Sequence, residues 1–153
     1  MAARDFRIGV GPLLIPDYID RSEIVFQSSP NKFEIPPGHL WAGSLRNTML
    51  SVIGTNLSRQ LNSTQVRTYP WEPGASLDYS IAIDVQQFHA QTGGDAILEA
   101  TWRLYDESSR RIVSQRHTNL KRPLEADGYE AVVVAQSKLL SDLASEIGNA
   151  IPH

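Results

Sequence analysis

Apolar and polar residues alternate along residues 77–85, and this pattern constrains the fold more than any other feature of the chain. One parity is entirely apolar or aromatic and the other is mainly polar; the apolar set is Leu77, Tyr79, Ile81, Ile83 and Val85. A period of two is that of a β-strand with one buried face. Phe88 breaks this parity, which predicts a β-bulge at Gln86–Gln87.

Two further strands are predicted directly after this one. Residues 96–104 alternate in the same way, and Trp102 lies on the apolar parity, so we expect it in the core. Residues 111–120 then pair back, and Pro123 closes the sheet. Turn-forming residues separate the three strands at short intervals. The sequence therefore predicts an antiparallel meander.

The first part of the chain predicts shorter strands. Residues 6–11 alternate, and Pro12 and Pro16 follow them, which is typical of a sheet edge or a strand terminus because proline has no N–H to donate. Residues 23–27 and 32–35 are predicted to form a hairpin around a turn rich in serine, proline and asparagine. An exposed edge strand at residues 6–11 could also pair across subunits and give a homo-oligomer.

Two helices complete the predicted fold. Apolar residues at helical spacing predict a helix over Leu40–Leu61, and a strand over Gln65–Tyr69 that returns beside the first strand by a right-handed crossover. Asp127 and Glu130 have the spacing of a capping box at the start of a second helix. We expect an α+β fold in which two helices pack on one face of a mostly antiparallel sheet. Residues 6–151 would form this single domain, and residues 1–5 would be disordered or derived from cloning.

Composition narrows the classes of function. The 153 residues are 41% hydrophobic, carry a net charge of −3 and contain no cysteine. The charge argues against a nucleic-acid-binding protein, and the absence of cysteine excludes disulfides, thiolate nucleophiles and cysteine-based metal sites. No apolar run approaches the ~20 residues of a membrane-spanning helix.

The chain carries no recognisable catalytic or cofactor-binding pattern. The four histidines have neither each other nor a carboxylate at metal-ligand spacing, and no serine lies in a nucleophile-elbow sequence. Asp78 and Asp84 lie roughly 20 Å apart on one strand, too far for paired-carboxylate catalysis. Gly9–Gly11 lacks the third glycine and the helix of a phosphate-binding loop. We therefore expect no catalytic residue, no metal and no cofactor.

Two short loops, Pro16–Arg21 and Tyr69–Gly74, combine charged residues, aromatic side chains and rigid prolines. Either their aromatic side chains cover the edges of the core, or the loops form an interface, since Tyr, Trp and Arg dominate binding hot spots. Trp41 is open to the same two interpretations. The candidate partner-binding residues are Asp17, Tyr18, Asp20, Arg21 and Trp71.

These same segments resemble the PqiC-like auxiliary lipoproteins, the ABC-transport auxiliary or DUF330 family. The likeness covers about residues 6–151 and rests on the order and spacing of several short motifs, because each motif alone is unspecific. The motifs are Ile8–Pro12 with Leu14, Pro16–Arg21, Trp41-Ala42 with Leu45, Asn56–Ser58, Tyr69–Trp71, Asp78-Tyr79 and Asp127–Tyr129.

The resemblance implies a periplasmic domain that is tethered to the outer membrane through a lipidated N-terminal cysteine. It also implies a non-enzymatic subunit that acts with a PqiB-like MCE-domain protein in lipid transport and envelope integrity. No lipobox cysteine is present, so we expect the chain to be the mature portion of a longer precursor. The alternative is a periplasmic carrier that holds a lipid or small ligand between sheet and helices.

Overall fold

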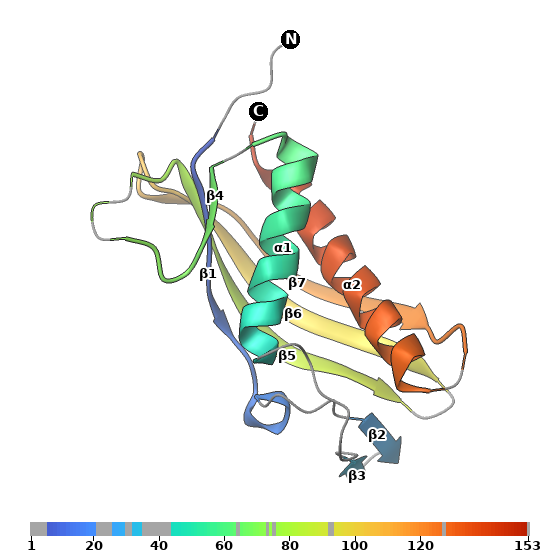
Figure 1. The fold of residues 1–153 in the computed structure, drawn as a ribbon. Helices are drawn as coiled ribbons and strands as arrows, with labels where there is room; N and C mark the ends of the chain where they lie inside the picture. The colour runs from blue at the N-terminus through green and yellow to red at the C-terminus, as the bar shows by residue number, and fades with distance from the viewer. Residues whose placement is uncertain are drawn as a thin grey trace.

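Two helices cover one face of a seven-stranded sheet in the computed structural model (Figure 1). The model describes residues 6–20, 26–29, 32–34, 44–63, 65–72, 74, 76–91, 94–126 and 128–152. The elements in chain order are β1 (Ile8–Leu14), the 3₁₀ turn η1 (Asp17–Ile19), β2 (Phe26–Ser29), β3 (Lys32–Glu34), α1 (Leu45–Leu61), β4 (Val66–Thr68), β5 (Tyr79–Gln91), β6 (Asp95–Asp106), β7 (Arg111–Pro123) and α2 (Tyr129–Ala150). The predicted α+β fold is confirmed.

The predicted meander forms the larger part of the sheet. β5 pairs antiparallel with β6, and β6 pairs antiparallel with β7, through long continuous registers. The register of β5 against β6 shifts between Val85 and Gln87, which confirms the predicted bulge. β4 pairs parallel with β1, as the strand–helix–strand order predicted, and β2 and β3 form the expected hairpin within the described residues.

The prediction that β1 is an edge strand is wrong. β1 lies inside the sheet, parallel to β5 on one side and to β4 on the other. Pro12 is tolerated there because the register of β1 against β5 shifts between Val10 and Leu13, and an irregularity of this kind relieves proline of a ladder hydrogen bond. The suggestion that residues 6–11 pair across subunits as a free edge is therefore also wrong.

The predicted helix starts lie partly outside the described residues. α1 begins after Ser44, whose side chain accepts a hydrogen bond of 3.2 Å from the Asn47 N–H. The residues from 40 to 43, including Trp41, are outside the described ranges. The predicted N-cap at Asp127 is wrong, because Gly128 is the N-cap of α2; Asp127 itself lies outside the described residues. Gly128 has φ 101°, a conformation that favours glycine over aspartate.

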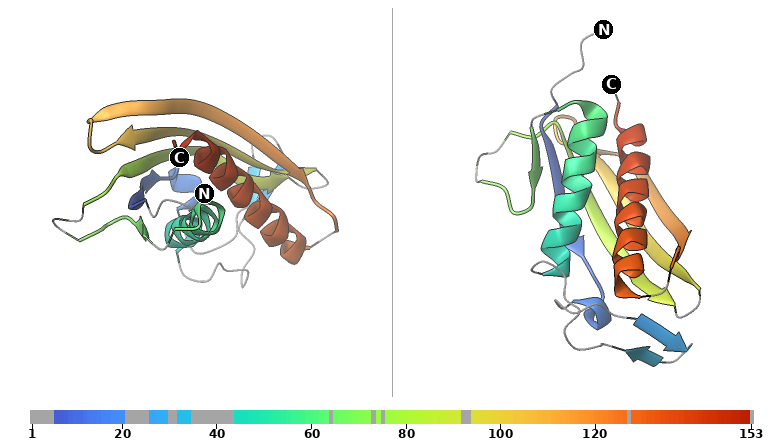
Figure 2. Two further views of the ribbon diagram at one scale, coloured as in Figure 1. Left: turned by 90° about the horizontal axis from the view of Figure 1, so that it is seen from above. Right: turned by 45° about the vertical axis from the view of Figure 1, so that its right-hand side comes forward.

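The core lies between the helices and the sheet, which arches over them when seen from above (Figure 2). The alternating residues of β5 and β6 point toward the helices, and Trp102 and Phe88 are the largest fully buried side chains. α1 contributes Met49, Ile53 and Leu57 to the same core. Each of these side chains stabilises the fold by about 1.5–3 kcal/mol when fully buried.

Trp102 also takes part in a polar contact that joins the sheet to α2. Its indole Nε1 donates to Thr118 Oγ1 at 3.1 Å and to Glu146 Oε2 at 3.2 Å. Thr118 is buried on β7, and its hydroxyl donates to the same Glu146 carboxylate. Arg116 approaches the other carboxylate oxygen at 3.5 Å. This contact fixes the position of α2 along β6 and β7.

Thr118→Val keeps the shape of the side chain but removes the hydroxyl donor to Glu146. A hydrogen bond to a charged group contributes about 1.5–3 kcal/mol, so we expect the free energy of unfolding in urea to fall by about that amount. Thr101→Val is the control, since Thr101 bonds His117 at 3.0 Å at an exposed position and its loss should cost below about 0.5 kcal/mol. Equal losses in the two variants would show that the contact does not hold α2.

Candidate functional site

The turn η1, which carries the candidate residues Asp17 and Tyr18, is hydrogen-bonded to the C-terminal part of β5. Tyr18 lies in η1, directly after β1, and its hydroxyl is 2.8 Å from His89 Nδ1. The Phe88 N–H donates to the same hydroxyl at 3.1 Å. His89 Nε2 is 3.0 Å from Gln27 Oε1 on β2. One histidine therefore joins the turn, the strand β5 and the hairpin strand β2.

The hydrogen bonds also determine the state of His89. The Tyr18 hydroxyl accepts from Phe88 and donates to His89 Nδ1, so that Nε2 carries the proton and donates to Gln27. Burial lowers the pKa of His89, because the imidazolium would lose its hydration. Burial likewise raises the pKa of Tyr18, while the hydrogen bond from Phe88 acts in the opposite direction. Both side chains are thus held neutral.

The acidic residues of this turn face the solvent. Asp17 is exposed in η1. Asp20 pairs with Arg46 of α1 at 3.1 Å, with both side chains 44% exposed, so the pair is a weak tie between the turn and the helix. Arg21 lies outside the described residues. Among the described residues of the turn, Asp17 therefore presents an exposed carboxylate, whereas the Asp20 carboxylate is paired with Arg46.

Trp71 lies in the loop between β4 and β5 and rests on β1. It is half-buried and makes an edge-on contact with Tyr69, with the ring centroids 5.3 Å apart. Glycines in β1 make room for these rings: a Cβ atom on Gly9 would lie 2.8 Å from the Trp71 ring, and one on Gly11 would lie 2.4 Å from Tyr69 Cβ. Gly11 also has φ 122°, which favours glycine.

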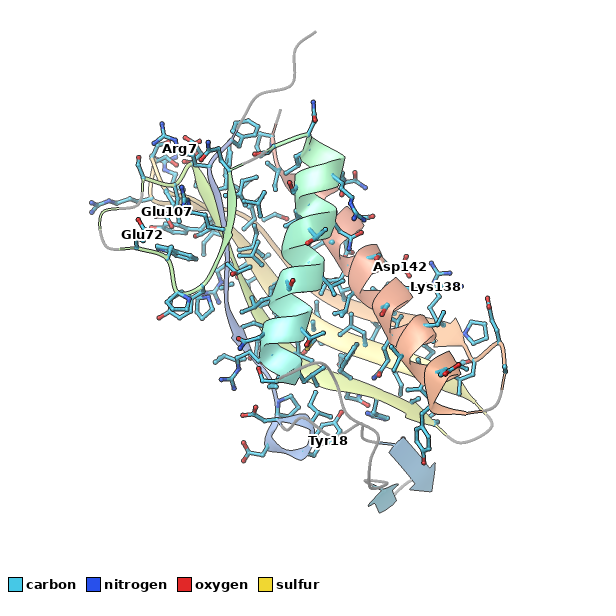
Figure 3. All side chains as sticks on the ribbon, viewed as in Figure 1. Arg7, Tyr18, Glu72, Glu107, Lys138 and Asp142 are labelled. Carbon is cyan, nitrogen blue, oxygen red and sulfur yellow. The ribbon has the colours of Figure 1, made fainter. Side chains whose placement is uncertain are left out.

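The two groups of candidates are not brought together. Tyr18 contacts β5 at Phe88, whereas Trp71 lies over Gly9, which pairs with Ser80 near the other end of β5. Eight residues of strand separate these positions by roughly 26 Å. Figure 3 accordingly shows Tyr18 at one end of the molecule and Glu72, the neighbour of Trp71, toward the other. They form two surfaces rather than one site.

A groove that sequence reasoning missed lies between α1 and β4. Its volume is about 510 Å³, and its lining includes Ser51, Thr55 and Arg59 of α1 and Val66 and Thr68 of β4. The polar face of α1 was visible in the sequence. The strand order places β4 at the edge of the sheet, beside the polar face of α1. The sequence did not reveal this order.

The described residues contain no group of three His, Asp or Glu side chains that could hold a metal ion. Apart from His89, the described ranges include one other histidine, His117, and it bonds Glu99 at 2.8 Å on the exposed face of the sheet. The side-chain bonds from Gln87 and His117 lower the pKa of Glu99. Neither described helix is long and apolar enough to cross a membrane.

The comparisons with known proteins agree on one family. Residues 1–148 match the model of the ABC-type transport auxiliary lipoprotein component. The intermembrane transport lipoprotein PqiC of Escherichia coli (strain K12) is 27% identical over 142 residues, which are 93% of this chain and 73% of that protein.

Two solved structures share the fold. A protein of the DUF330 family from Xanthomonas campestris is 21% identical, with a TM-score of 0.79 over 95% of this chain and 83% of that one. A PelC dodecamer from Paraburkholderia phytofirmans is 12% identical, with a TM-score of 0.57 over 100% of this chain and 94% of that one. With its family model matched over nearly the whole length, this chain belongs to the ABC-type transport auxiliary lipoprotein components.

Proposed function

We propose that this chain is a non-enzymatic subunit of a Pqi-like lipid-transport system that supports envelope integrity. It docks a periplasmic, PqiB-like MCE-domain protein and is held at the outer membrane by an N-terminal lipid anchor. Family membership supports the auxiliary role. The observation that carries the docking role is the rigid mounting of two solvent-facing loops on the sheet, by the Tyr18–His89 bond and by the seat of Trp71 on Gly9.

Rigid mounting favours binding because little conformational entropy is lost when a preorganised loop meets its partner. We propose that Asp17, Tyr18, Asp20, Arg21 and Trp71 contact the partner. Trp71 offers a half-exposed ring of the kind that anchors hot spots. The exposed Asp17 carboxylate offers charge that steers association.

The direction of the chain supports docking away from the membrane. An anchor that precedes β1 would hold the end of the molecule at which Ile8 lies, and β1 then runs toward η1. The acidic turn would therefore face the periplasm, while the Trp71 loop would lie closer to the membrane side. The turn and the Trp71 loop would then lie at different distances from the outer membrane, and a partner that extends through the periplasm could contact both.

The carrier alternative has less support. It requires a cavity inside the layer between sheet and helices. The described side chains there form one continuous buried core, and the hollows of about 510 Å³ and 330 Å³ lie at its margins, beside β4 and beside the end of β7. A homo-oligomer is compatible with docking, and the PelC protein of similar fold is a dodecamer. We propose that copies of this chain can assemble around a partner. β1 cannot supply the contact between copies, because it lies inside the sheet.

Docking predicts a loss of affinity when the half-exposed ring is removed. Trp71→Ala should weaken binding to the purified MCE-domain partner, measured by biolayer interferometry, about tenfold or more, the effect of a hot-spot residue. Val134→Ala is the matched control, because Val134 is exposed on α2, outside both loops. Circular dichroism checks that both variants fold. Unchanged affinity in a folded Trp71→Ala protein would remove this loop from the interface.

The acidic turn should lose its support in mild acid. The folded chain holds His89 neutral with a lowered pKa, whereas the unfolded chain takes up a proton at about pH 6.5. Below that pH the unfolded state binds more protons, so the free energy of unfolding falls as the pH drops from about 7 toward the lowered pKa.

His89→Gln removes this titration and should reduce the fall in the free energy of unfolding as the pH drops below about 7. The measurement is urea unfolding of both proteins across that range. Parallel curves for the wild-type protein and the variant would show that His89 does not couple the turn to pH. Tyr18→Phe separates the contributions, since it removes the hydroxyl from His89 while leaving the imidazole to titrate.

A further inference from the structure

The edge of the sheet at β4 has main-chain groups that no described residue uses. In the parallel ladder with β1, Ile8 N–H donates to Gln65 C=O at 3.0 Å and Tyr69 N–H donates to Val10 C=O at 2.8 Å. Backbone N–H and C=O groups alternate in direction along a strand. The main-chain groups of Arg67 therefore also point toward β1, and those of Val66 and Thr68 point away from the sheet. β4 is the last strand of the sheet on this side.

The groove beside this edge is bounded by the helix α1. α1 forms its opposite wall with small side chains at helical spacing, Ser51, Thr55 and Ser58. The side chains of Val66 and Thr68 lie against Gly54, so the wall and the strand meet at the base of the groove. The groove has a volume of about 510 Å³ and is open to solvent.

The chemistry of the groove favours a peptide over an acyl chain. Its lining is mainly hydroxyl, amide and guanidinium groups, which would be left without hydrogen bonds by a hydrocarbon. Arg59 is the one charged residue of the lining, and no ion pair to it occurs within the described residues. A carboxylate would complement it.

The opposite edge of the sheet is guarded against pairing. β7 is paired only with β6, and it exposes Arg111 and Lys121 near its two ends as well as Ile112 and Val113. Charged side chains of this kind prevent strand addition at natural sheet edges. Of these two described edges, β4 is the one that borders a groove, and its short strand carries a single charged side chain, Arg67.

We propose that the groove between α1 and β4 receives an extended segment of the MCE-domain partner, which adds to β4 as a strand and places a carboxylate against Arg59. Main-chain bonds to Val66 and Thr68 supply affinity, and side chains that alternate toward α1 supply specificity, as in other strand additions. This inference rests on the proposed docking function and assigns it a third surface, distinct from Asp17–Ile19 and from Trp71.

Two pairs of variants test the surface with the purified partner. Ser51→Trp fills the groove, and Ser137→Trp places the same ring on an exposed position of α2 as its control. Thr68→Pro removes one outward N–H and blocks strand addition, whereas Thr68→Val keeps that N–H and the shape of the side chain. Thermal melts confirm that all four proteins fold.

We expect Ser51→Trp and Thr68→Pro to weaken binding about tenfold or more, and each control to remain within about twofold of the wild-type protein. Arg59→Glu should weaken binding similarly by repelling the carboxylate. Overlapping peptides of the partner should then identify an acidic, extended segment that competes for the wild-type chain but not for Thr68→Pro.

Other results overturn the inference in distinct ways. If the wild-type chain does not bind the partner, the proposed docking function itself fails. If it binds and the groove variants bind equally well, docking stands and this surface does not contribute. If Ser51→Trp instead changes the molar mass of the isolated chain in light scattering, a second copy occupies the groove. If it abolishes binding to phosphatidylglycerol vesicles with partner affinity unchanged, lipid occupies it.

Discussion

The burial of one sheet face beneath two helices is the interaction on which the rest of the structure depends. β5 and β6 present their apolar parity to α1 and α2, and Trp102 stands at the centre with its indole N–H bonded to Thr118 and Glu146. This core fixes the strands and the helices relative to one another. The turn at Asp17, the Trp71 loop and the edge at β4 are all attached to this rigid layer, and their geometry follows from it.

The local parts of this fold could be predicted from the sequence. The alternation of residues 77–104 and the misplaced Phe88 identified two strands, their buried faces and the bulge, since a period of two and its interruption depend on neighbouring residues. The interior position of β1 could not be predicted, because it depends on pairing with β5, which is far away in the chain. The start of α2 was missed for another reason: the N-cap is Gly128, which adopts a positive φ, and a capping-box pattern does not reveal such a conformation.

The candidate site was predicted as residue types rather than as a surface. Tyr18 and Trp71 were identified by their aromatic character, and the structure places them at separate ends of β5 with different roles. Tyr18 turns its hydroxyl inward to the buried His89, so it orders the turn, whereas the ring of Trp71 stays half-exposed. The groove at β4 could not be predicted, because no sequence pattern reveals which strand is left at the end of a sheet.

Hydrogen–deuterium exchange of the chain, alone and with the purified MCE-domain protein, tests most directly the claim that it works by holding a partner. We expect slower exchange on complex formation at the amides of Val66 and Thr68, in the loop that carries Trp71, and around Asp17. Exchange in the buried strands β5 and β6 should not change. A partner that slows none of these three segments would contradict the account.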